Sequence, residues 1–218
     1  MKLAIKPTLF VLCTTTSSED DELSAVAENH GVKVCRGSET DVPGRLLKAC
    51  REFDVETFIL CETDEHFSDP EHVDLLLEYV EQHGGDWIHV EGNPIGAWLR
   101  AVSRFSMESL CGDMDTDNLS GWGAYFDQFP ERFKLKTLQF MSEEDSDLGG
   151  RVRLTVDYPE DFEVAEVLYK RLYTTGKPIR ISEVVAELRR DPSIIEINRH
   201  RQDDYELNVK EQSKGIIS

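Results

Sequence analysis

Two acidic residues, Asp64 and Asp157, each follow an apolar run that is typical of a buried strand. Residues 56–61 (ETFILC) precede the first, and residues 152–156 (VRLTV) precede the second. In open α/β sheets, ligands bind outside the carboxyl ends of the strands, so both carboxylates could reach one ligand. Carboxylate oxygens suit a Mg²⁺ ion that keeps several waters and contacts substrate phosphates. The two acids at strand ends are therefore candidates for a sparse magnesium site, in which Glu62 could assist.

Each acid also has a structural explanation. Asp157 stands just before Tyr158 and Pro159, where a helix is expected to begin, so its side chain could cap that helix. Asp64 could lie in a solvated loop. The local patterns leave both explanations open beside the metal site.

Basic and aromatic residues offer further binding groups. Arg36, Arg45 and Arg153 could pair with phosphate or carboxylate oxygens through two parallel hydrogen bonds. Trp122 belongs to the aromatic segment GWGAYFDQFPERF, residues 121–133, which could form a sugar platform, although such clusters more often belong to a core or a dimer interface. The sequence contains no GxSxG, HExxH, GxGxxG or Walker motif, so hydrolase, zinc protease and dinucleotide-binding functions lack support.

Alternating strands and helices should position these residues. The alternation of apolar strands with helices up to residue 85 favours a parallel sheet with right-handed crossovers. Helical periodicity predicts one buried helix face that includes Leu23 and Val26, and another that includes Phe162, Ala165, Leu168 and Leu172. Residues 36–45 and 142–150 are expected to be loops. Ser182 is expected to cap a helix. The predicted strands cover residues 9–14, 32–35, 56–61, 87–90, 99–104, 134–140 and 152–156, and a short helix is predicted over 106–111.

Composition limits the classes of partner. The 218 residues are 39% hydrophobic, and 43 acidic against 24 basic residues give a net charge of -19. This charge opposes binding to nucleic acid or to an anionic membrane, although it could also suit a high-salt cytoplasm. We expect a cytoplasmic protein for three reasons. The five cysteines include no CxxC pair, no apolar run reaches about 20 residues, and the sequence shows no convincing signal cleavage site.

Several segments together resemble the cytidylyltransferase family of spore coat polysaccharide biosynthesis proteins, which are related to the synthetases of CMP-KDO and CMP-sialic acid. The resemblance extends to about Asn198, and RGSETDVPGR and RLTVDYPEDFE are its most specific parts. The other segments that carry it, in the same order, are VLCTTTSSEDDEL, SDPEHVD, AVSRFSMESL and PERFKLKTL.

The resemblance implies a nucleotide-diphospho-sugar transferase fold of the glycosyltransferase-A type, with a mixed, mostly parallel sheet flanked by helices. One domain would cover residues 1–200, with a less regular, aromatic-rich part over 86–150 and a polar tail over 201–218. The implied reaction transfers CMP from CTP to an acidic or other sugar, with Mg²⁺ and release of pyrophosphate. By position, Asp64 and Asp157 would act in catalysis and hold the metal, and the middle part would contribute to sugar binding and to a homodimer. The residues that would border the cleft are Arg36, Gly37, Ser38, Asp41 and Arg45.

The sequence departs from this family in two places. The family usually opens with a strand and a loop of the pattern ARMGSTRLPGK, which holds the base and the triphosphate, and no equivalent loop occurs in this sequence. Thr63 stands before Asp64, where the family usually has a small residue. Two hypotheses follow: an active cytidylyltransferase whose loop comes from elsewhere, or a noncatalytic homologue that binds a sugar, a nucleotide sugar or a protein partner.

Overall fold

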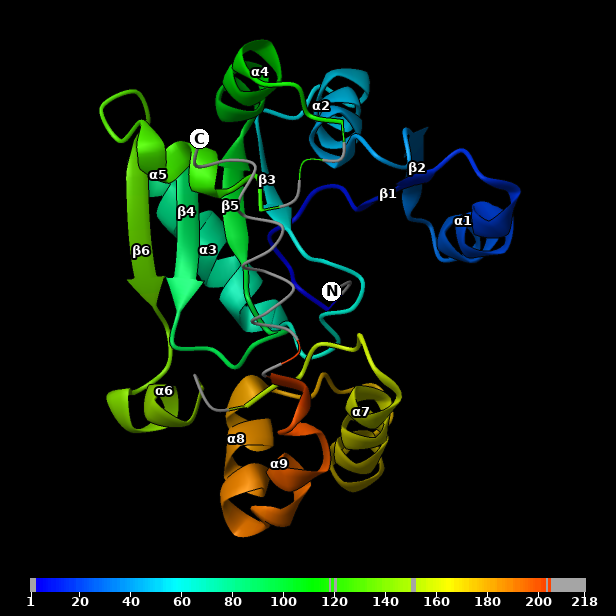
Figure 1. The fold of residues 1–218 in the computed structure, drawn as a ribbon, viewed down its shortest axis with the longest axis vertical. Coiled ribbons are helices and arrows are strands. Elements are labelled where there is room, and N and C mark those ends of the chain that lie inside the picture. Colours follow the sequence, from blue (N-terminus) through cyan, green and yellow to red (C-terminus); the bar gives the residue numbers. More distant parts are fainter. Residues whose placement is uncertain (1–2, 118, 120, 150–151, 203, 205–218) are drawn as a thin grey trace.

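A computed structural model describes residues 3–117, 119, 121–149, 152–202 and 204 (Figure 1). The strands are β1 (Val11–Thr15), β2 (Lys33–Gly37), β3 (Thr57–Leu60), β4 (Trp87–Glu91), β5 (Arg100–Ser103) and β6 (Leu135–Gln139). The helices are η1 (Ser18–Asp20), α1 (Asp21–Asn29), α2 (Val42–Glu52), α3 (Pro70–His83), α4 (Arg104–Asp113), α5 (Ala124–Gln128), α6 (Glu143–Gly149), α7 (Pro159–Leu172), α8 (Ile181–Arg190) and α9 (Ser193–Asn198).

The main sheet has the strand order β3-β5-β4-β6. Strand β5 is antiparallel to both of its neighbours and β4 is parallel to β6, so three of the four strands run in one direction. The carboxyl ends of β3 and β4 therefore lie at the same edge of the sheet. Strands β1 and β2 form a separate parallel pair, whereas the sequence alternation predicted that they would join β3 in one sheet. Every residue of β3 is only partly buried as a result.

Helices cover both faces of the main sheet, because alternate residues of each strand point to opposite sides. Ile88 and Ala101 face α3 and pack with Leu76 in one apolar cluster. Trp87 and Val102 belong to a second cluster on the other face, which includes residues of α2, α4 and α5. None of the described helices is long and apolar enough to cross a membrane.

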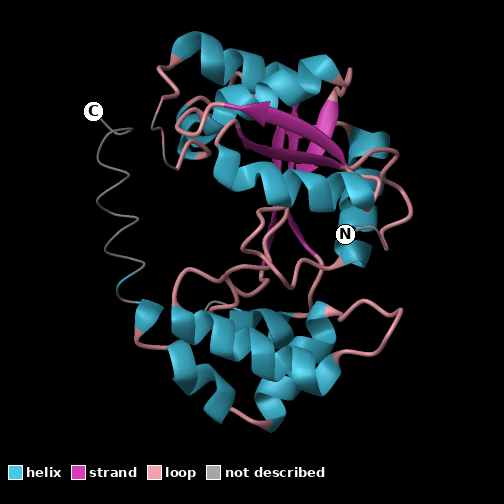
Figure 2. Cartoon of the chain, turned by 90° about the vertical axis from the view of Figure 1, so that its right-hand side faces the viewer, coloured by secondary structure: helices cyan, strands magenta, loops and turns pink. Residues whose placement is uncertain are grey.

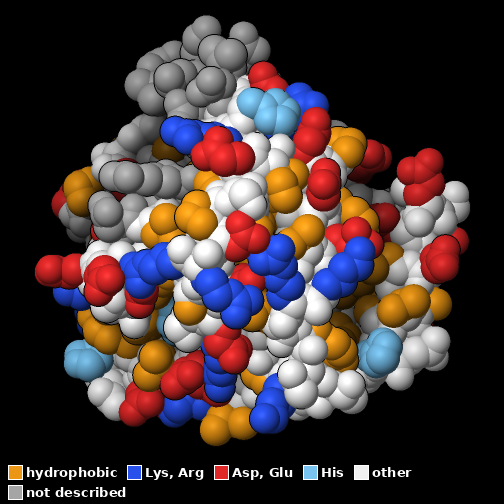
Figure 3. Space-filling model, turned by 90° about the horizontal axis from the view of Figure 1, so that it is seen from below, with side chains coloured by type: hydrophobic (Ala, Val, Ile, Leu, Met, Phe, Trp, Pro, Cys, Tyr) orange, Lys and Arg blue, Asp and Glu red, His pale blue; other side chains and the backbone are white. Residues whose placement is uncertain are grey.

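Helices α6 to α9 gather beyond one end of the main sheet, as Figures 1 and 2 show. A third apolar cluster holds this region together and includes Leu154, Leu168 and Val184. Seen from this end, acidic and basic side chains are interspersed over the surface (Figure 3). One ion pair of this region joins the partly exposed Arg171 to the buried Glu187 at 2.9 Å.

The predicted strand over residues 152–156 is wrong in its extent. The structure has a single β-bridge here, between Ile95 and Arg153, with hydrogen bonds from the Ile95 amide to the Val152 carbonyl (3.1 Å) and from the Leu154 amide to the Ile95 carbonyl (2.6 Å). The pairing stops because the partner segment turns at Gly96, whose φ is +87°.

Two predicted helix faces are also wrong in part. Leu23 and Val26 of α1 are 44% and 49% exposed, because α1 packs mainly against the narrow β1–β2 pair. In α7, Phe162 is 61% exposed and the preceding Asp161 is buried instead. The buried position of Asp161 turns the next residue, Phe162, toward solvent.

Three helices begin at other residues than the sequence predicted. Helix α2 begins inside the predicted loop 36–45, since the Asp41 carboxylate accepts a hydrogen bond from the Gly44 amide at 2.7 Å. Helix α4 begins at Arg104, which was expected to end a strand, and α8 begins before Ser182. The predicted surface loop 142–150 contains the short helix α6.

Asp69 connects the start of α3 to the start of α8, and its removal should destabilise the fold. Its buried carboxylate accepts hydrogen bonds from the amides of Glu71 (2.9 Å) and Ile181 (3.0 Å) and from Arg180 Nη1 (2.7 Å). We expect Asp69→Ala to lower the free energy of unfolding by about 2–4 kcal/mol in urea denaturation, because buried donors lose their acceptor. The control Glu71→Ala removes an exposed partner of the same arginine and should cost less than about 1 kcal/mol. Equal losses in the two variants would contradict this role of Asp69.

Candidate active site

Asp64 and Asp157 meet at the hydroxyl of Thr155. Thr155 Oγ1 lies 3.2 Å from Asp64 Oδ2 and 3.4 Å from Asp157 Oδ2, and its single hydrogen can bond to one carboxylate at a time. A backbone hydrogen bond from the Val156 amide to the Asp64 carbonyl (3.2 Å) fixes the two segments side by side. The Asp157 side chain is 39% exposed. The structure thus brings the two predicted acids together at an open edge of the sheet.

Three side chains of the segment 153–157 converge at this point. Thr155 Oγ1 lies 3.4 Å from Asp157 Oδ2, and Arg153 Nη2 donates to the same Asp157 oxygen. Gly96 lets a neighbouring loop approach this segment closely. A Cβ atom on Gly96 would lie 2.0 Å from the Thr155 amide nitrogen and 2.5 Å from its Cα atom, which no side chain can tolerate.

A buried network of Arg153, Asp161 and Asn198 contacts the Asp157 carboxylate from the protein interior. Arg153 is 2% exposed, and its Nε donates to both oxygens of Asp161 at 3.1 and 3.2 Å. Its Nη2 donates to Asp157 Oδ2 and to Asp161 Oδ2. Asn198 Nδ2 donates to Asp161 Oδ1 at 2.8 Å and to the Arg153 carbonyl at 2.9 Å. Arg153 therefore contacts the candidate site from inside the protein.

The helix-cap explanation of Asp157 does not hold in the structure. The carboxylate that accepts the amides at the start of α7 is that of Asp161, with 3.0 Å bonds from the amides of Asp157 and Tyr158. Asp161 thus performs the capping role, and the Asp157 carboxylate faces Thr155 and Arg153.

Glu65 follows Asp64 directly in the chain and is only 8% exposed. Burial raises the pKa of its carboxyl to about 8, and the nearby charges of Glu62 and Asp64 act in the same direction. Its Oε2 atom is buried without a hydrogen-bond partner among the described residues. The side chain is therefore mostly protonated at neutral pH.

This raised pKa makes the stability depend on pH. The unfolded carboxyl ionises near pH 4.5 and the folded one near pH 8, so the folded state binds more protons between these values. The free energy of unfolding contributed by Glu65 consequently falls as the pH rises from about 4.5 to about 8. Glu65→Gln should remove this dependence and gain on the order of a few kcal/mol relative to wild type over that range. Urea denaturation of both proteins at pH 5 and pH 8 would measure this gain. The same difference in free energy of unfolding between Glu65→Gln and wild type at the two pH values would contradict the prediction.

Arg100 is a cation at the same sheet edge that the sequence reasoning missed. It is the first residue of β5 and pairs with Leu60, the last residue of β3. Its Nη1 lies 3.5 Å from Glu62 Oε2, and its guanidinium lies 5.6 Å from the Trp98 ring centroid. The antiparallel pairing of β5 with β3 brings it here, and the sequence pattern did not reveal that pairing.

The predicted cleft residue Arg36 organises the loop after β1. Its Nε donates to the Thr15 carbonyl at 2.7 Å, its Nη2 to the Ser17 carbonyl at 2.5 Å and its Nη1 to Asp21 at 2.5 Å. The guanidinium therefore links the carboxyl ends of β1 and β2.

The other predicted cleft residues form one local cluster at the start of α2. Arg45 Nη1 donates to the Ser38 carbonyl at 2.8 Å, and Ser38 Oγ accepts from the Asp41 amide at 3.1 Å. A Cβ atom on Gly37 would lie 2.9 Å from Arg45 Cγ, so the glycine accommodates the arginine stem. No hydrogen bond or ion pair within the described part of the chain joins this cluster to Asp64 or Asp157, so the binding roles of these residues stay predictions.

Trp122 lies at the other end of the main sheet. Its ring contacts Trp87, the first residue of β4, with a centroid distance of 5.4 Å, and also contacts Phe126. Asp64 and Asp157 lie beyond the carboxyl ends of β3 and β4. Helix α5, which directly follows Trp122 in the chain, lies at the opposite end of the main sheet in Figure 1, so the structure does not bring Trp122 to the two acids. The aromatic segment is mainly core, and a sugar-binding role of Trp122 stays a prediction.

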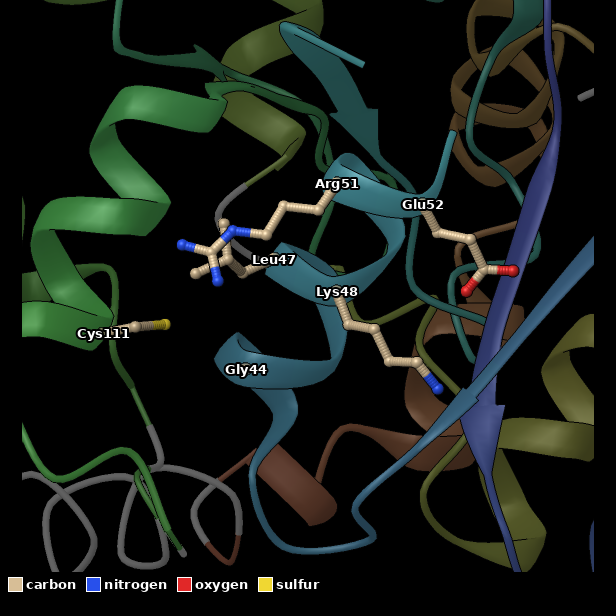
Figure 4. Close-up of a pocket in the computed structure, with 6 residues that line it drawn as sticks. All are labelled: Gly44, Leu47, Lys48, Arg51, Glu52 and Cys111. Atoms are coloured by element: carbon tan, nitrogen blue, oxygen red, sulfur yellow. The ribbon is translucent and has the colours of Figure 1, made fainter. Parts of the chain in front are cut away.

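A hollow of about 580 Å³ between α2 and α4 is a separate feature (Figure 4). Lys48 and Arg51 line it, but Lys48 Nζ donates to the Arg36 carbonyl at 2.5 Å, and Arg51 lies 3.4 Å from Glu108. Its Cys111 has a raised pKa because of burial, so the thiol stays protonated at neutral pH. The hollow lacks paired acids, so the carboxylate pair is the better candidate.

The donor set at the carboxylate pair fits a divalent cation with few protein ligands. The described residues include no group of three or more His, Cys, Asp and Glu side chains able to hold a metal. Two carboxylates from separate segments, one of them well exposed, are what a Mg²⁺ ion needs when waters and substrate phosphates complete its shell.

Comparison with solved structures defines the class of fold. A cytidylyltransferase from Leptospira borgpetersenii superposes with a TM-score of 0.74, covering 85% of this chain and 77% of its own, at 22% identity. A CMP:2-keto-3-deoxy-manno-octonic acid synthetase, solved in complex with CTP, gives a TM-score of 0.54 over 78% of this chain and 84% of its own, at 12% identity. The chain has the cytidylyltransferase fold, and the predicted mixed α/β class is confirmed.

Sequence comparison adds a particular relative. The spore coat polysaccharide biosynthesis protein SpsF of Bacillus subtilis (strain 168) is 27% identical over 195 residues, which cover 84% of this chain and 75% of that protein. An uncharacterized protein of Methanocaldococcus jannaschii is 24% identical over 212 residues, 89% of this chain and 79% of its own. No protein-family model matches the chain. The chain is homologous to SpsF, and the resemblance seen in its sequence is confirmed.

Proposed function

We propose that this protein is a cytidylyltransferase of surface polysaccharide synthesis, which transfers CMP from CTP to a sugar with release of pyrophosphate. The observation that carries the proposal is the convergence of Asp64 and Asp157 on the Thr155 hydroxyl, at the carboxyl end of β3. Its fold supports the assignment, since a solved relative in fold is a CMP-sugar acid synthetase bound to CTP.

The residues of the site would divide the work as follows. Asp64 and Asp157 would hold a Mg²⁺ ion, which would neutralise the charge that develops on the phosphates during transfer. The Thr155 hydroxyl would hold the carboxylates of Asp64 and Asp157 close together. The sugar hydroxyl oxygen forms a bond to the α-phosphorus of CTP while the bond to the bridging oxygen breaks, so pyrophosphate leaves and the hydroxyl proton passes to solvent.

Arginine side chains near the site would orient the anionic groups. Arg100 is partly exposed at the same edge. Among the described residues, Glu62 pairs with its Nη1 at 3.5 Å, so the guanidinium could turn toward a phosphate or a sugar carboxylate. Arg36 and Arg45 would border the nucleotide from the β2–α2 side, where their backbone contacts already order the loop.

A second candidate function is noncatalytic binding of a sugar, a nucleotide sugar or a protein partner. The observation in its favour is that Arg153 already neutralises part of the charge of Asp157. In that case the site would still bind ligand, but it would not cleave CTP.

Incubation of the protein with CTP, Mg²⁺ and a panel of acidic sugars tests the proposal. We expect pyrophosphate release that depends on one of the sugars, with a CMP-sugar detected by mass spectrometry. ATP and GTP serve as controls and should give no release. Binding of a CMP-sugar without any turnover of CTP would favour the noncatalytic function instead.

A further inference from the structure

Arg153 lies between two carboxylates whose surroundings differ. The Asp161 side chain is fully buried and accepts three further hydrogen bonds, from Asn198 and from the amides of Asp157 and Tyr158. The Asp157 side chain is 39% exposed, and its Oδ2 faces only Arg153 and Thr155 among the described contacts. Arg153 is thus anchored on one acid and extends toward the other.

The guanidinium cannot move away from Asp157. Arg153 is 2% exposed, and it lies 5.5 Å from the ring centroid of Tyr158. A bifurcated hydrogen bond from Nε to both Asp161 oxygens and a further one from Nη2 hold it on Asp161. Leaving Asp161 would place an uncompensated charge in the protein interior, which is strongly unfavourable. A cation that binds Asp157 must therefore share that carboxylate with a fixed positive charge.

We propose that Arg153 is a positioning residue that acts as an internal counter-ion of Asp157. It orders the carboxylate and at the same time weakens the binding of a divalent cation alone. A triphosphate that arrives with the cation brings enough negative charge to offset the repulsion, so metal and nucleotide bind mainly together. The part of this inference that concerns nucleotide rests on the proposed function, whereas the effect of Arg153 on the metal alone does not.

A purely structural arginine would behave differently. If Arg153 only supported the fold, every change to it would loosen Asp157 and weaken metal binding. If it acts as a counter-ion, removing its charge should strengthen the binding of the metal alone. The two roles therefore predict opposite signs.

Mn²⁺ affinity is measured by the electron paramagnetic resonance signal of the free ion. It shows, without any catalytic assay, whether removing the Arg153 charge strengthens or weakens metal binding. We expect Arg153→Met to bind Mn²⁺ alone about fivefold more tightly than wild type, the size of a partly exposed charge interaction. Because Arg153→Met leaves Asp161 without its counter-charge, the double variant Arg153→Met/Asp161→Asn removes both charges and should show the same tightening. Asp157→Asn marks the site, since it should abolish the measured binding.

The wild-type protein should also bind Mn²⁺ at least about tenfold more tightly when CTP is present, and the double variant should show a smaller gain. Weaker or unchanged Mn²⁺ binding in the folded double variant, without nucleotide, would overturn the counter-ion role. An absence of any CTP effect in wild type would count against the proposed function, and the comparison with Mn²⁺ alone would still decide the role of Arg153.

Discussion

Asparagine at position 64 or 157 is expected to lower CTP-dependent pyrophosphate release by at least about 100-fold. Either change removes one of the two carboxylates that converge on the Thr155 hydroxyl, and asparagine keeps the shape of the side chain. The loss should appear in the turnover rate at saturating CTP and sugar, measured by coupled detection of pyrophosphate.

A matched control separates this effect from a general loss of acidic charge. Asp127 is an exposed aspartate of α5, near the opposite end of the main sheet, and Asp127→Asn should retain wild-type turnover. Unfolding by urea should show that the site variants remain folded. Turnover within about threefold of wild type in both Asp64→Asn and Asp157→Asn would exclude this pair as the catalytic centre.

Alanine at position 96 is expected to damage both the fold and the site. The new Cβ atom would overlap the backbone of Thr155, and the φ of +87° is itself unfavourable for alanine. The backbone must shift, so we expect a loss of about 2–4 kcal/mol in the free energy of unfolding and a displacement of Thr155 from the two acids.

Gly112→Ala provides the control for this prediction. Gly112 lies in α4, and a Cβ atom there would meet nothing within 4 Å. Alanine favours the helix, so this variant should keep or gain up to about 1 kcal/mol of stability. Urea denaturation and pyrophosphate release measured on both variants would check the contrast. A Gly96→Ala protein with wild-type stability would show that the 93–97 loop does not hold the site segment.

The sequence carried most of the information on the carboxylate pair. Each acid follows an apolar run, and the rule that ligands bind at the carboxyl ends of strands predicted that Asp64 and Asp157 would lie together. The ends of α3 also follow local signals, since the Asp69 side chain caps it, Pro70 is its first residue and Gly84 follows its last. The position of each acid after an apolar run and the ends of α3 depend on neighbouring residues, which local patterns can show.

Features that depend on distant contacts were not predictable in this way. The insertion of β5 between β3 and β4 brings Arg100 to the site, and nothing in the local pattern of residues 99–104 shows which strand they join. The sequence indicates only a turn at Gly96, because its close contact with Thr155 depends on the tertiary structure. Asp161 looks like a surface residue of a helix, yet it is buried against Arg153. Of the expected apolar face of α7, Phe162 is exposed, whereas Ala165 and Leu168 are buried.

Calorimetric titration of CTP in the presence of Mg²⁺ tests the central claim most directly. The proposed function predicts that the wild-type protein binds CTP with Mg²⁺, and that Asp64→Asn and Asp157→Asn each weaken this binding at least about tenfold. No heat of binding in the wild-type protein, or equal affinity in all three proteins, would contradict the assignment of Asp64 and Asp157 as the centre of a cytidylyltransferase.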